Sequence, residues 1–399
     1  MKQTLIAFLF FVMLSQTVYA ETSFRGEVKL VEEYFSGRAS DESGLYGEIN
    51  LNLKIEDDQE RYAIILNPKL RGDTWNLSAL EPIRDRERPV LFPYEMYLEF
   101  GVGNSLLAGA GYKNHFLGQG EEINPSESTP VDYLNPMEPD RFGVLSAWAE
   151  LRLFSGFYLK GIAFESTRSI MPLKEGNPWR LPQLDGVVIG EASLPNTPNL
   201  TAVLGWEGLG ANFSLSYSHG YGGFPELSLQ KSNTLVPEYF KSNLFGLNVY
   251  KDVWNFGLKL EAGYRKSDTH QDDYVQYVLG VDRLKTWGRS RLYVLLQYVR
   301  EEVVEEGDNP FQGLDLSRAL KDTLTTKVEY KHGRFGLDLR GAYELDREGY
   351  YIQPKVRYNW ESLEFFIGCD FIGGPDEDSF LGSYKKNDKR LSGGVIIHF

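Results

Sequence analysis

The chain has 399 residues, of which 14% are aromatic and 40 are glycine, and it carries a formal net charge of -14. That charge argues against a generic nucleic-acid-binding protein, because contacts to phosphate need a basic surface. The single cysteine, Cys369, cannot form a disulfide within the chain, which excludes a small secreted domain stapled by disulfides.

Residues 1–20 have the pattern of a secretory signal peptide. Lys2 precedes an apolar run from Leu5 to Leu14. A polar stretch follows and ends in Val18-Tyr19-Ala20, which has small or modest residues at the two positions that signal peptidase recognises. The apolar run is about ten residues, too short to cross a bilayer as a helix. We therefore expect cleavage after residue 20 and a single domain over residues 21–399; the competing interpretation is a buried N-terminal helix.

Hydrophobic alternation dominates the rest of the chain. Between residues 45 and 55 the odd positions are apolar or glycine and the even positions are mostly polar. Segments 94–102, 258–265 and 335–344 alternate in the same way, with the apolar residues at even positions in the first two and at odd positions in the third. A period of two indicates a strand with one apolar and one polar face. The length of these runs matches a tilted membrane strand and exceeds the usual strand of a soluble protein.

The alternation predicts about eighteen strands and no separate domain. They span residues 24–35, 45–56, 61–71, 91–103, 106–113, 142–154, 157–166, 200–207, 211–221, 243–253, 256–266, 274–284, 291–303, 319–331, 334–345, 350–360, 363–371 and 390–399.

The connections alternate between short and mostly long. The short ones are Asp57-Glu60, Asn104-Ser105, Ser155-Gly156, Gly208-Gly210, Asn255, Lys285-Ser290, His332-Gly333 and Glu361-Ser362, and the longer ones include 114–141, 167–199, 222–242, 304–318 and 372–389. Tight turns on one rim and long loops on the other are the plan of a bacterial outer-membrane barrel. An even strand count places both termini on the short-turn rim, which is then periplasmic.

Aromatic residues flank the short turns, where the membrane interface would lie. They are Phe100, Phe154, Phe157, Trp206, Phe213, Trp254, Phe256, Trp287, Phe335 and Trp360. The competing interpretation is an aromatic-rich soluble sandwich. We predict an all-β fold: a transmembrane, antiparallel, up-and-down β-barrel of about 18 strands, with short periplasmic turns and long extracellular loops, in contact with outer-membrane lipids.

The last strand alternates to the end of the chain, with Leu391, Val395 and Ile397 on one face and Phe399 as the final residue. This resembles the terminal strand of Gram-negative outer-membrane β-barrels of the porin superfamily. The resemblance implies a bacterial outer-membrane location, and it implies that Phe399 is an assembly signal recognised by the barrel-assembly machinery. In strand count the chain is similar to the eighteen-stranded substrate-selective porins and to alginate-export-like channels.

The stretch from Gly118-Gln119-Gly120 through Asn124-Pro125 to Asn135-Pro136 resembles the long constriction loops of such barrels. We predict that loop 114–141 folds inward and narrows the pore; the alternative is an outward surface lid, which segment 167–199 could equally supply. Its acidic residues would form the constriction: Glu121, Glu122, Glu127, Asp132, Glu138 and Asp140.

The polar faces of the strands carry many charges, which favours a water-filled lumen, because unpaired buried charges are costly. A basic wall is predicted on three late strands and would face the acidic loop, setting up a field that selects solutes by charge. Its members are Lys327, Lys331, Arg334, Arg340, Lys355 and Arg357. A charge-balanced lumen without selectivity remains open.

Enzymatic activity is not expected. Ser218 beside His219 could suggest a barrel lipase, and His270 with Asp272 loosely resembles outer-membrane protease sites, but those proteases have about ten strands. We predict no catalytic residues, no cofactor and no metal site; the acidic tip Asp376-Glu377-Asp378 is more simply a solvated loop than a Ca²⁺ site.

The sequence therefore predicts a porin-like outer-membrane channel for small polar or charged solutes, with an anion or a saccharide as the finer expectation. The alternative is a surface-binding or polysaccharide-binding and export barrel whose pore is plugged. Small solutes or saccharides are the expected partners, and nucleic acid is not.

Overall fold

The computed structural model describes most of the chain after the predicted signal peptide. The described residues are 20–36, 42–57, 62–73, 91–118, 120, 123–133, 135–166, 169, 179–180, 184, 186–190, 195–223, 225–231, 234–268, 271–307, 316–375, 379–384 and 389–399. The predicted signal peptide (except Ala20), Glu121, Glu122, His270 and the acidic tip at 376–378 lie outside them.

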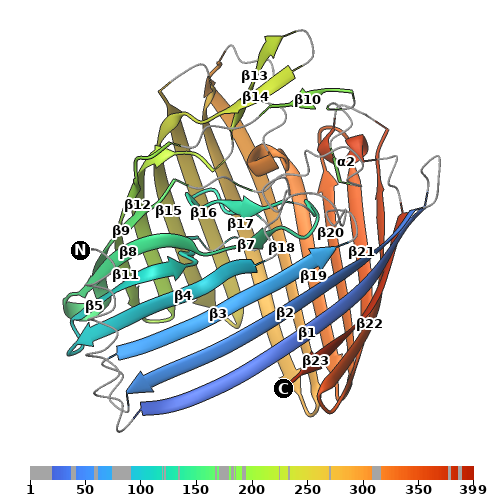
Figure 1. The fold of residues 1–399 in the computed structure, drawn as a ribbon, viewed down its shortest axis with the longest axis horizontal. Helices are drawn as coiled ribbons and strands as arrows, with labels where there is room; N and C mark the ends of the chain where they lie inside the picture. Colours follow the sequence, from blue (N-terminus) through green and yellow to red (C-terminus); the bar gives the residue numbers. More distant parts are fainter. Residues whose placement is uncertain are drawn as a thin grey trace.

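Eighteen strands form one sheet in the described residues. Their arrangement around the barrel can be followed in Figure 1. They are β1 (Ala20–Ser36), β2 (Glu42–Asp57), β3 (Tyr62–Asp73), β4 (Leu91–Val102), β5 (Leu106–Lys113), β8 (Val144–Arg152), β9 (Phe157–Phe164), β11 (Asn199–Gly208), β12 (Ala211–Tyr221), β15 (Lys241–Val253), β16 (Phe256–Ser267), β17 (Asp273–Trp287), β18 (Ser290–Glu305), β19 (Thr323–His332), β20 (Phe335–Glu344), β21 (Tyr350–Trp360), β22 (Leu363–Gly373) and β23 (Lys389–His398).

The sheet closes on itself. Each of these strands pairs antiparallel with its neighbour along the chain, and β1 pairs with β23, with Val28 opposite Ile397 and Leu30 opposite Val395. Closure removes the unpaired sheet edges that lipid cannot satisfy. The predicted barrel of about 18 strands, its strand positions and its seam between the first and last strands are confirmed.

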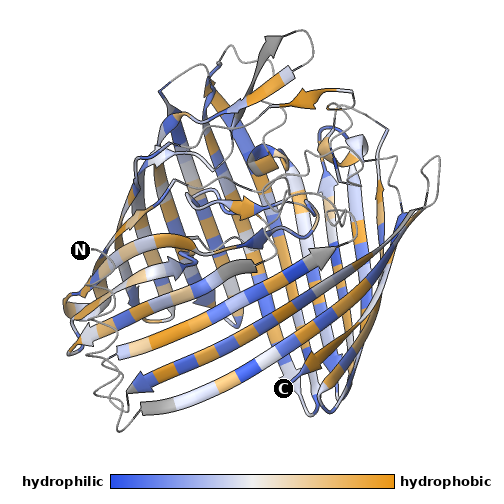
Figure 2. Ribbon diagram, viewed as in Figure 1, coloured by the Kyte–Doolittle hydropathy of each residue, from blue (hydrophilic) through white to orange (hydrophobic). Residues whose placement is uncertain are grey.

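The barrel is apolar outside and polar inside. On β22 the outward Ile367 is 57% exposed whereas Asp370, on the opposite face of the strand, is 1% exposed. Figure 2 shows the resulting alternation of hydrophobic and hydrophilic bands along β1, β2 and β3. This reverses the arrangement of a soluble protein, because here the apolar face of each strand points away from the enclosed space.

Tight turns connect the strands on one rim. The predicted turn at Lys285–Ser290 was too wide, because β17 continues to Trp287 and leaves only Gly288-Arg289 in the turn. Gly288 has a φ of 56°, a conformation that suits a two-residue hairpin and costs glycine little. Phe154 and Trp254, both predicted beside short turns, are 78% and 88% exposed.

The long connections contain structure that the alternation does not predict. A three-stranded sheet stands above the barrel in Figure 1, formed by β10 (Val188–Ile189), β13 (Glu226–Lys231) and β14 (Thr234–Glu238). Smaller elements of the long connections are the pair β6 (Val131–Asp132) and β7 (Asp140–Arg141), the 3-10 turn η6 (Leu316–Arg318) and the short helix α2 (Phe380–Ser383). A further 3-10 turn, η3 (Phe154–Gly156), forms the short turn between β8 and β9. Among the described residues, no helix is long and apolar enough to span a bilayer.

An apolar cluster lies at the long-loop end of the barrel and joins several of these connections. It contains Phe35, Met137, Trp179, Leu184, Leu235, Leu316, Tyr351, Ile372, Leu381 and Tyr384, all buried. Since barrel strands contribute only Phe35, Tyr351 and Ile372, the cluster is made mainly by residues of the long connections. We call this group the mouth cluster.

Candidate functional site

The described residues of the connection between β5 and β8, namely 114–118, 120, 123–133 and 135–143, lie inside the barrel. We call this connection the inner segment. Its first anchor is Glu261 on β16, a carboxylate that is 1% exposed. Glu261 accepts hydrogen bonds from the N–H groups of Gly120 and Ser126, at 2.7 and 2.9 Å, and from the Ser126 hydroxyl at 2.9 Å. The chain around residues 118–126 is thereby held against the wall formed by β15 and β16.

His115, near the start of the inner segment, is also buried. Its Nε2 lies 2.8 Å from the Ser146 hydroxyl on β8, and its ring meets Trp148 edge-on at 5.2 Å. Burial, followed by the charges of Lys160 and Lys113, lowers the pKa of His115 to about 3. The ring is therefore neutral at physiological pH and serves as a packed polar anchor.

The middle of the inner segment reaches the early strands. The guanidinium of Arg71 on β3 contacts Asp132 at 3.4 Å and Asp140 more closely, and Lys69 lies 3.4 Å from Asp140. Burial alone would raise the pKa of Asp140, but Lys69 and Arg71 outweigh it and hold the pKa below its usual value. The expectation that these two acids face the late basic strands is therefore wrong, since their partners come from β3.

Glu138 does reach the late strands. Its carboxylate lies 3.1 Å from Lys355 Nζ on β21 and 3.6 Å from Arg390 on β23, and it accepts a 3.0 Å hydrogen bond from Gln353. Burial would raise the pKa of Glu138, yet Lys355, Arg390, Arg340 and Lys29 lower it further than burial raises it. The inner segment thus spans the lumen, with contacts on β16 and on β21 and β23.

Glu127 is the remaining acidic residue of the predicted constriction loop that lies among the described residues. It forms hydrogen bonds with its own neighbours in the chain. One of its oxygens accepts from the N–H groups of Ser128 and Thr129, at 3.1 and 3.0 Å, and from the Thr129 hydroxyl at 2.7 Å.

The predicted basic wall is largely neutralised. Lys327 lies 2.9 Å from Glu329, Lys355 pairs with Glu138, and Arg357 contacts Asp338 and Glu364. Arg340 faces the same side and contributes to lowering the pKa of Glu138. Lys331 and Arg334 are exposed and flank the short turn between β19 and β20, well away from the inner segment's contacts.

Two cavities lie on either side of the inner segment. The upper cavity has a volume of about 280 Å³ and is lined by residues of the long connections such as Gly222 and Gln271, together with Ile123, Thr129 and Tyr133 from the inner segment. The lower cavity, of about 470 Å³, is lined near the short turns by residues such as Asn104 and Phe157, and by Phe116 and Leu117 of the inner segment. The inner segment therefore separates the two cavities.

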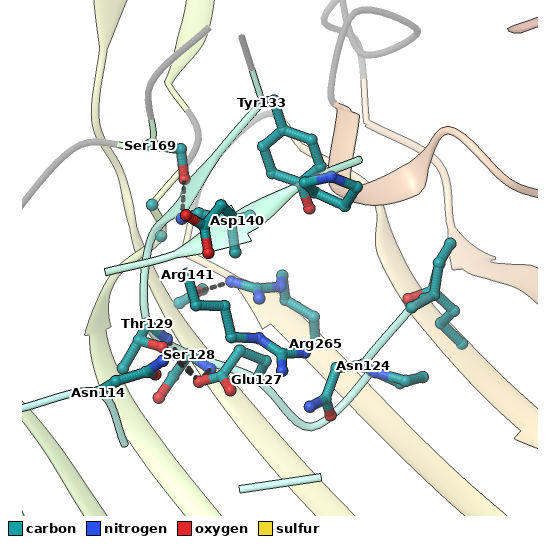
Figure 3. Close-up of a pocket in the computed structure, with 18 of the residues that line it drawn as sticks. Asn114, Asn124, Glu127, Ser128, Thr129, Tyr133, Asp140, Arg141, Ser169 and Arg265 are labelled. Atoms are coloured by element: carbon teal, nitrogen blue, oxygen red, sulfur yellow. Dashed lines mark hydrogen bonds between the residues drawn. The ribbon is translucent and has the colours of Figure 1, made fainter. Parts of the chain in front are cut away.

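Two arginines line the upper cavity, and Figure 3 shows both among its lining side chains. Arg265 on β16 donates to the Ser242 hydroxyl at 3.2 Å, and the Arg141 guanidinium lies 4.1 Å from the centre of the Phe116 ring. Neither forms an ion pair in the described part of the chain. Arg265 occupies a polar position of an alternating strand, so its inward direction was predictable. No sequence pattern pointed to Arg141.

The barrel-lipase alternative gains no support from the structure, and the protease-like alternative depends on His270, which lies outside the described residues. Ser218 bonds Thr201 at 2.8 Å on the inner face of β12, whereas His219, one residue later, points outward and lies 3.0 Å from the Asn243 side chain. Neighbours along a strand point to opposite faces, so the two side chains cannot act on one substrate.

No protein-family model and no curated protein matches this chain by sequence. Among solved structures it is similar to the BenF-like porin from Pseudomonas fluorescens Pf-5, at 10% identity over 95% of this chain and 98% of that chain, with a TM-score of 0.53. It is also similar to Pseudomonas aeruginosa OpdO, at 11% identity over 96% of each chain, with a TM-score of 0.51. At such identities the similarity concerns the fold alone, and it agrees with the closed antiparallel barrel of eighteen strands.

Proposed function

We propose that this chain is an outer-membrane channel that passes small solutes between the upper and lower cavities, past the inner segment. The observation that carries the proposal is the pair Arg141 and Arg265 in the upper cavity. A guanidinium with no carboxylate partner attracts anions, and the attraction is stronger in a cavity than in bulk water. We therefore propose small anionic solutes as the preferred class.

The lining of the upper cavity supports an organic anion. Besides the two arginines it presents aromatic rings, from Tyr94, Tyr133 and Phe240, and uncharged polar groups such as Ser128 and Thr129. Two carboxylates also line it: Glu127, which is bonded to Ser128 and Thr129, and Asp140, which pairs with Lys69 and Arg71. Ligand sites combine apolar contacts with a few polar groups that fix orientation. A carboxylate or phosphate on a small body with an apolar face has the matching chemistry.

The test is ion selectivity of single channels in planar bilayers under a KCl gradient. We expect the wild-type channel to prefer anions and Arg141→Gln and Arg265→Gln each to shift the reversal potential toward cations. Arg300→Gln is the matched control, since Arg300 lies on the outward face of β18, where it pairs with Glu302 at 3.1 Å. Equal selectivity in all four proteins would refute the role of the two arginines.

The second candidate is a surface-binding or polysaccharide-binding barrel with a plugged pore. The mouth cluster favours it, because buried contacts such as that of Trp179 with Tyr384 tie the long connections together over part of the opening. If the pore is plugged, correctly folded protein gives no single-channel currents in the same planar bilayers, and an added polysaccharide binds to the protein.

We also propose that residues 1–20 are removed on export and that Phe399 is recognised by the barrel-assembly machinery. Mass spectrometry of the protein purified from outer membranes tests the first point: the expected mature chain begins near Glu21.

A further inference from the structure

The inner segment is shaped around Glu261. A Cβ on Gly118 would collide with the carboxylate and with Asn124, and a Cβ on Gly120 would collide with the carbonyl of Ile123. Both glycines are therefore required by the turn that presents N–H groups to Glu261. This gives a physical reason for the Gly118-Gln119-Gly120 part of the motif.

The barrel wall is shaped to receive the same turn. Gly246 on β15 and Gly263 on β16 are direct cross-strand partners, and both belong to the inward face. A Cβ on Gly263 would collide with the carbonyl of Pro125, and one on Gly246 would lie 2.7 Å from Cβ of Ser126. The two glycines leave a recess in the wall, and Pro125 and Ser126 occupy it beside Glu261.

Asn124 links this anchor to the upper cavity. With its amide nitrogen turned toward Glu261, Asn124 donates to both carboxylate oxygens, and its amide oxygen accepts from Arg141 Nη2 at 3.2 Å. The carboxylate thus fixes which way the amide points. The amide oxygen in turn gives the Arg141 guanidinium a neutral hydrogen-bond partner at the edge of the cavity.

We propose that Glu261 is the positioning residue of the channel: it seats the inner segment and, through Asn124, directs Arg141 into the upper cavity. The effect on ion flow rests on the proposed channel function, whereas the seating of the segment does not. An acidic side chain would then sustain the anion preference of the pore although its own charge opposes anions.

The change in ion selectivity expected for the loss of Glu261 has the opposite direction to the change that its charge alone would cause. Removing a negative charge from the lumen should make a pore more anion-selective. Loss of the Glu261 anchor should instead release the inner segment, widen the passage and misdirect Arg141, which lowers the anion preference.

The experiment compares Glu261→Gln with Asp282→Asn in planar bilayers. Asp282 is an inward carboxylate on the neighbouring strand β17, paired with Lys259 at 2.9 Å, so its amide variant removes the same charge without touching the inner segment. In Glu261→Gln the amide nitrogen must face the N–H of either Gly120 or Ser126, and at least one of these hydrogen bonds is lost. We expect larger unitary conductance and a reversal potential shifted toward cations for Glu261→Gln, and a shift toward anions for Asp282→Asn.

Asn124→Ala tests the link to Arg141 on its own. We expect it to lower the anion preference while the backbone of the segment stays seated. All variants are first checked for folding by their heat-dependent migration in detergent gels. If Glu261→Gln shifts the reversal potential in the same direction as Asp282→Asn, the positioning role is refuted.

Amide hydrogen exchange measures the seating without any channel activity. The amides of Gly120 and Ser126 should be protected in the wild type and in Asp282→Asn, and should exchange faster in Glu261→Gln. If the wild type is silent in bilayers but this difference is seen, the channel function fails and the seating role of Glu261 stands. Unchanged exchange in Glu261→Gln overturns the seating role. If Glu261→Gln fails to fold, Gly263→Val, which fills the recess at Pro125, takes its place and must give the same faster exchange.

Discussion

Glu138 in the inner segment and Lys355 on β21 form an ion pair at 3.1 Å although they stand 217 residues apart in the chain. Arg390 on β23 lies 3.6 Å from the same carboxylate. This contact holds the far end of the inner segment against the late strands, opposite the anchor at Glu261. The two ends are thus held by different chemistry: neutral donors surround Glu261, and cations surround Glu138.

The contacts of Glu138 with Lys355 and Arg390 have a predictable dependence on pH. The pKa of Glu138 is lowered from its ordinary value of 4.5, so the folded protein favours the ionised form. Stabilisation by this carboxylate is then fully present above pH 4.5 and is lost only as pH falls through the depressed pKa. We expect single-channel conductance of the wild type to be constant from about pH 8 to pH 5.

Glu138→Gln removes the charge at every pH, so its conductance should be larger and noisier across that whole range. Glu302→Gln, on the outward face of β18, is the control and should match the wild type. A wild-type conductance that rises to the level of Glu138→Gln between about pH 8 and pH 5 would contradict this assignment, because the carboxylate would then lose its charge within that range.

The mouth cluster should restrict access to the lumen. Trp179 is 3% exposed, its ring lies 5.7 Å from those of Phe35 and Tyr384, and its carbonyl accepts a 3.1 Å hydrogen bond from the Tyr384 hydroxyl. Trp179→Ala should weaken the cluster by about 3–5 kcal/mol, as for other large buried aromatic side chains.

Because the cluster is made mainly by long connections, that loss should loosen the opening and leave the barrel intact. The measurement is unitary conductance together with heat-dependent gel migration: conductance rises and migration is unchanged. Trp254→Ala, at an 88% exposed position beside a short turn, should leave both as in the wild type. Equal conductance of Trp179→Ala and wild type would show that the cluster does not limit flow.

Phe399 closes the seam of the barrel. Its carbonyl accepts from the N–H of Gly26 at 2.8 Å, its N–H donates to the carbonyl of Gly26 at 3.0 Å, and its ring covers Gly26, where a Cβ would collide with it. Deletion of Phe399 should leave this end of the β1–β23 seam unpaired in lipid, which is costly.

We expect that deletion to reduce insertion into the outer membrane and to leave chain in the periplasm, measured by fractionation and immunoblotting. Phe371→Ala removes an outward phenylalanine from β22, 40% exposed, without disturbing the seam, and should insert normally. Normal delivery of the truncated protein would exclude Phe399 as an assembly signal.

The sequence determined the strands, their order around the barrel and the face that each residue occupies. Alternation has a period of two, so one apolar run fixes the direction of every side chain on that strand. The inward directions of Glu261, Arg265 and Lys355 follow from this local rule. Closure follows as well, because an even number of paired strands in lipid can leave no free edge.

Only the tertiary structure decided which inward charges meet. Asp132, Asp140 and Glu138 lie within nine residues in the sequence, yet the first two bond Arg71 on β3 and the third bonds Lys355 on β21. No local pattern distinguishes them, because partner choice depends on the path of a segment that crosses the lumen. The position of Arg141 in the cavity could not be predicted for the same reason. Its direction is set by Asn124, which is held by Glu261, and this contact joins residues more than a hundred positions apart that short-range periodicity does not relate.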